Sequence, residues 1–376
     1  MKQILVLFLL FLGAIPGAPL LAEQPERATA KTLERIEISG DGHGFQTAES
    51  KTPFLPWGLN YGHDGRLIED FWNDDWETVA NDFDRMKQIG ADVVRVHLQS
   101  GKFMTAPDAP NRTAFTNLSK LLHFAEKTGL YLDLTGLACY RPADTPAWYD
   151  ALDEAGRWNA QANFWSAVAD TCAASPAVFC YDLINEPIVP GEKRVAGQWR
   201  SGKLFGGYDF VQFIALDPAG RHREDIAVTW IQRMTAAIHT HDKSHLVTVG
   251  LLPWSRQWHH LSGFVPERIA PELDFISVHL YPDSKLPGEA LEALQKCAVG
   301  KPIVIEETFP LSCTPAELET FLTASRKTAT GWMMHFDGET PEELDVQAHA
   351  HPLSLQKAVY RDALRLFEHL GSQFPH

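Results

Sequence analysis

The stretch Val178-Phe-Cys-Tyr-Asp-Leu-Ile184 is an apolar and aromatic run that leads directly into Asn185-Glu186-Pro187. A short apolar run that ends at a turn signal is typical of a buried strand. A long amphipathic segment, 224–239, comes next, and a second apolar run, 246–251, follows it. Strand, helix and strand in this order predict parallel strands joined by a crossover helix.

The same alternation extends over the chain in both directions. The predicted strands are 57–60, 92–97, 131–135, 178–184, 246–251, 275–280, 302–305 and 331–335. The predicted helices are 76–89, 116–128, 163–172, 224–239, 289–296, 315–325 and 353–370. This count predicts an α/β fold, a (β/α)8 TIM barrel, with a short N-terminal β-hairpin that begins at 35–38. A doubly wound open sheet is the alternative, but Gly58-Leu-Asn-Tyr-Gly62 is not a phosphate-binding glycine loop.

The first residues have the form of an export signal. Lys2 precedes the apolar run 4–12, and small residues lead to a cleavage site after Ala22. We therefore expect a signal peptide at 1–22, a single barrel domain at 23–376, and a secreted or periplasmic protein. A membrane anchor is the alternative, but this run is short and is followed by Gly and Pro residues.

Composition restricts the partners. The net charge of −15 argues against a nucleic-acid partner, which would favour a basic face. After signal cleavage we expect no membrane contact, and the sequence leaves the oligomeric state open. Five cysteines remain, an odd number, and buried free thiols are the preferred interpretation for most of them.

Carboxylates follow two of the predicted strands directly. The fourth strand ends in Asn185-Glu186, and the seventh ends in Glu306-Glu307. In a barrel, the carboxyl ends of the strands carry the functional groups. Cleavage of a glycosidic bond needs one carboxyl group to protonate the leaving oxygen and a second on the other side of the sugar, about 5–5.5 Å away in retaining enzymes.

With these motifs the chain resembles glycoside hydrolase family 5, the cellulase and mannanase family, over nearly the whole mature length. The resemblance implies that Glu186 is the acid/base, that Asn185 contacts the sugar 2-hydroxyl, and that Glu307 is the nucleophile. Thr308-Phe-Pro310 stands where the family usually has an aromatic residue and Gly after the nucleophile. This departure leaves Glu306 as the alternative nucleophile.

Four further residues match the family pattern. The resemblance implies that Arg95 orients the nucleophile, that His279 and Tyr281 line the site with Tyr281 donating to the nucleophile, and that Trp332 floors the nearest sugar subsite. The alternatives are an ion-pair partner for Arg95 and core positions for the other three. Other residues near strand ends are weaker candidates for sugar contacts: Trp57, Asn60, His63, Asp64, Trp72, His97, Trp148, Trp254 and Trp258.

The sequence thus predicts a retaining glycoside hydrolase that cleaves a β-linked glucan, mannan or related oligosaccharide. A non-catalytic carbohydrate-binding barrel and a transglycosylase that uses the same two glutamates are the alternatives. We expect no cofactor and no metal, because no His-Glu-x-x-His or paired-cysteine spacing occurs. The long connection 188–223 is expected to fold over the mouth of the barrel as a wall of the substrate groove, and a solvated surface excursion is the alternative.

Overall fold

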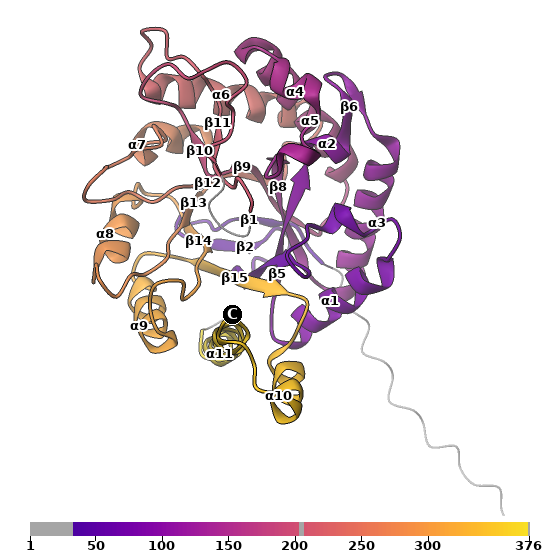
Figure 1. Ribbon diagram of the computed structural model, residues 1–376, viewed down its shortest axis with the longest axis vertical. Coiled ribbons are helices and arrows are strands. Elements are labelled where there is room, and N and C mark those ends of the chain that lie inside the picture. The colour runs from indigo at the N-terminus through magenta and orange to yellow at the C-terminus, as the bar shows by residue number, and fades with distance from the viewer. Residues whose placement is uncertain (1–32, 203–206, 375–376) are drawn as a thin grey trace, which may run out of the picture. The chain divides into compact units, whose positions relative to one another are not determined.

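The computed structural model describes residues 33–202 and 207–374. Its centre is a closed barrel of eight parallel strands, around which the helices are arranged (Figure 1). The strands in barrel order are β4 (Trp57–Gly62), β5 (Val93–Gln99), β8 (Tyr131–Ala138), β9 (Val178–Asn185), β12 (Leu246–Leu251), β13 (Ile276–His279), β14 (Ile303–Glu307) and β15 (Gly331–Asp337), and β15 pairs with β4. Each predicted strand overlaps one of these, so the predicted TIM barrel is confirmed. The predicted signal peptide lies outside the described residues.

Each predicted helix overlaps a long helix of the structure. These long helices are α1 (Trp76–Gln88), α3 (Arg112–Thr128), α5 (Glu154–Cys172), α6 (Arg223–His239), α8 (Glu289–Lys296), α9 (Pro315–Ser325) and α11 (Leu355–Gly371). Helix α5 begins nine residues before the predicted range 163–172. Local chemistry fixes their ends: Thr314 and Glu317 form a capping box at the start of α9, and Gly129 ends α3 in the left-handed conformation, with φ of 70°.

The sequence did not predict several short elements. These are the helices α2 (Ser100–Phe103), α4 (Ala147–Ala151), α7 (Pro266–Ile269) and α10 (Pro341–Ala350), and the strand pairs β6 (Met104–Ala106) with β7 (Ala109–Pro110) and β10 (Pro187–Ile188) with β11 (Gln212–Phe213). Most lie in the connections that follow barrel strands, where turn chemistry and tertiary contacts outweigh hydrophobic periodicity.

A small antiparallel sheet covers the amino-terminal end of the barrel. It consists of β1 (Ile36–Ile38), β2 (Phe45–Thr47) and the short β3 (Pro53–Phe54), so the predicted hairpin is present with a third strand added. Ile36 and Phe45 are buried in one cluster with residues near the strand starts: Val93, Tyr131, Phe179, Leu246, Phe275, Val304 and Met333. This end of the interior is therefore apolar, which leaves the other end for polar groups.

Two further observations concern the pairing of the cysteines and the length and hydropathy of the helices. All five cysteines are unpaired and four of them are buried, which agrees with the prediction that most are buried free thiols. Within residues 33–202 and 207–374, no helix combines the length and the apolar character needed to cross a membrane.

Candidate active site

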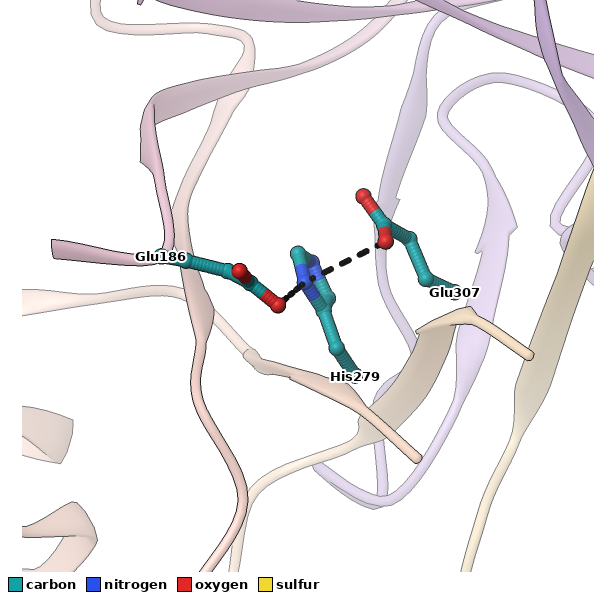
Figure 2. A group of neighbouring side chains, drawn as sticks. All are labelled: Glu186, His279 and Glu307. Carbon is teal, nitrogen blue, oxygen red and sulfur yellow. Dashed lines mark hydrogen bonds and ion pairs between the residues drawn. The ribbon is translucent and has the colours of Figure 1, made fainter. Parts of the chain in front are cut away.

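The two predicted catalytic glutamates meet at the mouth of the barrel. Glu186 follows β9 directly and Glu307 is the last residue of β14. His279, at the end of β13, lies between them (Figure 2). Its Nδ1 is 3.0 Å from Glu186 Oε1 and 3.6 Å from Glu307 Oε2. A carboxyl oxygen of Glu186 lies within 4.8 Å of one of Glu307, which is closer than the roughly 6.5–9.5 Å between two carboxyl groups that flank both a sugar and an attacking water.

A register shift in the sheet explains why both Glu306 and Glu307 are inside the barrel. Alternate residues of a strand normally face opposite sides. Between β13 and β14, Val278 pairs with Ile305, but the next pair is His279 with Glu307, so Glu306 is skipped. This bulge directs both glutamates inward, with Glu306 fully buried and Glu307 at the mouth.

Two donors hold the carboxylate of Glu307. Arg95 Nη1 donates to Oε1 at 2.5 Å, and the Tyr281 hydroxyl donates to Oε2 at 2.6 Å. Burial alone would raise the pKa of this carboxyl, but the charges of His279 and Arg95 outweigh burial and hold the pKa below its ordinary value. Glu307 is therefore an ionised, oriented carboxylate.

Arg95 lies fully buried on β5 and connects the strands around the site. Its Nη1 also donates to Asn60 Oδ1 at 2.9 Å, and its Nη2 donates to Asp182 Oδ2 at 2.8 Å and to Asn185 Oδ1 at 3.0 Å. The planar guanidinium suits such a fixed set of acceptors. Arg95 is thus a fixed cation below the two glutamates.

His279 is surrounded by carboxylates. Burial would lower its pKa, but the charge of Glu307 and the hydrogen bonds to Glu186 and Glu306 raise that pKa to about 10. Its Nε2 lies 3.2 Å from Glu306 Oε2. A pKa this high favours the imidazolium form of His279, in which both ring nitrogens carry a proton.

Glu186 has an unusual backbone conformation, with φ of 45°. This left-handed region is uncommon for a residue other than Gly and disfavoured before Pro, so the conformation stores strain. The Glu186 N–H donates to the carbonyl of Gly250 on β12 at 2.9 Å, which helps to hold it. Strain of this kind at a strand end is frequent in functional sites.

Asn185 and Asn60 are both buried below the mouth. The Asn185 amide accepts from Arg95 and donates from Nδ2 to the Phe210 carbonyl at 3.2 Å. The Asn60 Nδ2 donates to the carbonyls of Glu306 and Met334 at 2.8 and 3.0 Å. Asn60 therefore ties β4 to its neighbours and supports Arg95, a role that sequence reasoning missed.

The prediction for Trp332 is wrong. Its indole is 2% exposed and packs against Trp57 and Phe374 outside the barrel wall, with Nε1 donating to Ser325. The strand alternation decides this, because Met333 lies in the interior cluster and the odd-numbered residues of β15 face inward. His335 faces the site instead, stacked on Tyr281 with Nε2 3.1 Å from its hydroxyl.

The connection between β9 and α6 reaches across the mouth side of the barrel. The Tyr208 hydroxyl donates to the carbonyl of Gly65, which follows β4, and its ring stacks on Phe210. Asp209 N donates to the Tyr140 carbonyl at 2.6 Å. The described part of this connection therefore contacts the loops that follow β4 and β8.

Two groups of side chains have the mutual spacing of metal ligands: Glu186, His279 and Glu307, and the buried set Asp133, Asp182 and Glu306. In both groups a protein cation already lies among the carboxylates. In the first group this cation is His279. In the second group it is Arg95, whose Nη2 lies 2.8 Å from Asp182 Oδ2 and 3.5 Å from Glu306 Oε2. We assign no metal to either group.

Comparison with solved structures shows the same fold in β-mannan enzymes. An exo-β-1,4-mannosidase, Op5Man5, from Opitutaceae bacterium strain TAV5 is 17% identical with a TM-score of 0.65, and the match covers 89% of this chain and 62% of that one. The β-mannanase of the blue mussel Mytilus edulis is 17% identical with a TM-score of 0.59, and the match covers 92% of this chain and 98% of that one.

Sequence comparison identifies the family. Mannan endo-1,4-β-mannosidase 2 of Arabidopsis thaliana is 28% identical over 138 residues. The match covers 33% of this chain and 25% of that protein. The sequence profile of cellulase (glycosyl hydrolase family 5) matches residues 41–316, well over half of the chain. The chain therefore belongs to the cellulase family of glycoside hydrolases, glycosyl hydrolase family 5.

Proposed function

We propose that this glycoside hydrolase is a retaining β-glycosidase in which Glu307 is the nucleophile and Glu186 the acid/base. The observation that carries the proposal is the separation of the two carboxyl groups, whose oxygens approach within 4.8 Å. An inverting enzyme needs a wider gap, about 6.5–9.5 Å, to hold the attacking water. Glu307 is favoured over Glu306 because Glu306 is fully buried beneath the mouth.

The geometry supports a double displacement. The ionised Glu307 attacks the anomeric carbon while Glu186 gives its proton to the leaving oxygen, which yields a glycosyl ester of Glu307 and a free alcohol. Glu186 then takes a proton from water, the water oxygen attacks the anomeric carbon, and the Glu307 carboxylate leaves. Arg95 and Tyr281 orient Glu307 before the attack and receive the carboxylate when it returns.

We propose a β-1,4-linked mannan or manno-oligosaccharide as the substrate. The named neighbours support this class, since the Arabidopsis relative and both solved structures described above are mannan or mannoside enzymes. A β-glucan is the second candidate, because the family profile that matches is that of cellulase. We also propose that the protein is secreted or periplasmic, where it would meet such a polymer.

Two alanine variants test the mechanism. Glu307→Ala is expected to lose measurable hydrolysis, and added azide should partly restore turnover of an aryl β-mannoside by forming the α-glycosyl azide in a single displacement. Glu186→Ala should lose about 10²–10⁴-fold in kcat on mannan but far less on an aryl glycoside whose leaving group needs no protonation. Rates are measured by product analysis on mannan and glucan.

Glu319→Ala, which removes an exposed carboxylate on α9, is the matched control and should behave as wild type. Wild-type turnover in both active-site variants would contradict the mechanism. Binding of mannan without any hydrolysis would favour the non-catalytic barrel, and products longer than the substrate would identify a transglycosylase.

A further inference from the structure

Below the two glutamates, the interior of the barrel holds a layer of three more carboxyl groups. Asp133 on β8, Asp182 on β9 and Glu306 on β14 are each fully buried. One oxygen from each lies within 4.8 Å of those of the other two. Carboxylates this close in a dry interior repel one another strongly, so the three cannot all be ionised together.

Hydrogen bonding distinguishes the charged members of this layer. Asp182 accepts from Arg95 Nη2 at 2.8 Å and from the Gly250 N–H at 2.7 Å. Glu306 accepts from the Ser277 hydroxyl at 3.0 Å and faces His279 Nε2 at 3.2 Å. Both carboxyl groups are thus supplied with donors, as ionised groups require.

Asp133 differs from the other two. Within the described part of the chain, neither of its oxygens receives an N–H or O–H donor. A buried carboxylate without donors is strongly unfavourable, whereas a carboxylic acid brings its own O–H. Burial first, and then the charge of Glu306, raises the pKa of Asp133 well above its ordinary value. The neutral acid is therefore the stable form of Asp133, and Glu306 is the available acceptor for its O–H.

We propose that Glu306, held as an anion by neutral Asp133, is a positioning residue that keeps a proton on the pair formed by His279 and Glu186. The imidazole connects the two glutamates, with Nε2 toward Glu306 and Nδ1 3.0 Å from Glu186 (Figure 2 shows the Glu186 side). The inference rests on the role proposed for Glu186, because that residue uses the proton.

The contact between His279 and Glu186 allows the proton to move without any other reactant. The Nδ1–H bond of the imidazolium breaks and an O–H bond forms at Glu186 Oε1. The imidazole is left neutral, with its Nε2–H still donated to Glu306. Glu186 then holds the proton that the leaving oxygen of the sugar receives.

The sequence provides the space for this arrangement at Gly250. A Cβ at that position would lie 2.8 Å from Glu306 Oε2, 2.9 Å from His279 Nε2 and 3.1 Å from Arg95 Nη2. Any side chain there would displace the cluster. The absence of a side chain at Gly250 therefore allows Glu306 and His279 to lie in contact.

The charges around His279 determine the direction of the effect. The titratable groups that act on it come from the strands β5, β14 and β15 and from the position directly after β9: Glu186, Glu306, Glu307, Arg95, His97 and His335. Removing one nearby anion weakens proton binding by the whole His279–Glu186 pair, whichever atom holds the proton. The alkaline limb of kcat/KM reports the loss of this proton.

Two isosteric variants test the proposal through the pH dependence of kcat/KM on an aryl β-mannoside. Glu306→Gln should move the alkaline limb to lower pH by about one unit or more. Asp133→Asn replaces one neutral group by another and should leave the position of that limb unchanged. An equal shift in both variants, or no shift in Glu306→Gln, would overturn the proposal. Circular dichroism verifies that each variant is folded.

Two measurements need neither activity nor the Glu306 variant, so they separate this proposal from the proposed function. In ¹⁵N NMR spectra of wild type at neutral pH, both ring nitrogens of His279 should be protonated. The infrared spectrum of wild type should contain a protonated-carboxyl band that is missing in Asp133→Asn. A neutral His279 ring, or a band unaffected by Asp133→Asn, contradicts the inference even if the enzyme hydrolyses mannan.

Discussion

At the scale of single residues, the hydroxyl of Tyr281 is the group whose removal tests the electrostatics of Glu307 most cleanly. It donates to Oε2 at 2.6 Å, and no other hydroxyl is bonded to that carboxylate in the described chain. Loss of a hydrogen bond to a charged group costs about 1.5–3 kcal/mol, so Tyr281→Phe should lower kcat/KM roughly 10- to 150-fold.

The variant should also move the acidic limb of the pH profile. Glu307 must be ionised to attack, and removal of a donor to the carboxylate raises its pKa, so the acidic limb moves to higher pH. Tyr131→Phe is the matched control, because the Tyr131 hydroxyl bonds the carbonyl of Glu34 near the opposite end of the barrel. An unmoved acidic limb in Tyr281→Phe would contradict the geometry.

Residue-level prediction from the sequence succeeded where a strand end decides the position. Glu186, His279 and Glu307 could be brought together because the carboxyl ends of parallel strands converge at one face. The prediction for Trp332 was wrong because the alternation of inward and outward side chains along β15 directs this residue away from the site. The inward turn of Glu307 depends on a bulge, because Glu306 already shares the inner face with Val304, and the bulge leaves no signature in the residues themselves.

At the scale of elements, the connection from β9 to α6 is the segment most suited to select substrate length. Tyr208 links it to the loop after β4, and Phe210 accepts from Asn185 beside the acid/base. Tyr208→Ala should alter the ratio of kcat/KM for long and short manno-oligosaccharides roughly two- to tenfold, the range of one aromatic contact of ~0.5–1.5 kcal/mol.

Lys193→Ala provides the control in the same connection. Its side chain is 78% exposed and, among the residues that the structure describes, forms an ion pair with Asp217 alone, so the ratio should stay at the wild-type value. An unchanged ratio in Tyr208→Ala would show that the connection is only a surface excursion. The sequence revealed the length of this segment, but β10, β11 and the Tyr208 contact depend on distant parts of the chain and could not be read from it.

At the scale of the whole molecule, the export signal is the remaining prediction. We propose cleavage after Ala22, because an apolar run followed by small residues is the form that signal peptidases process. Protein produced with residues 1–22 in a Gram-negative host should appear outside the cytoplasm, with Glu23 as its first residue by mass spectrometry. Leu9→Arg, which interrupts the apolar run, should keep the protein in the cytoplasm at full length.

Export of the uncleaved chain, or export that is unaffected by Leu9→Arg, would contradict this prediction. Whole-chain prediction was otherwise reliable for the barrel, since eight strands alternating with helices allow few arrangements. The sheet β1–β2–β3 was foreseen only in part, because a two-residue strand such as β3 carries almost no pattern of its own.

The apolar cluster around Phe45, at the amino-terminal end of the barrel, has a practical consequence for attachment of the enzyme to a surface. Leu33 packs against the cluster around Phe45, and Phe374 packs against Trp57 at the start of β4. Both ends of the described chain thus lie at the face opposite Glu186 and Glu307. A support or fusion partner joined beyond either end would leave the sugar-facing side directed outward, with free access for a polymer.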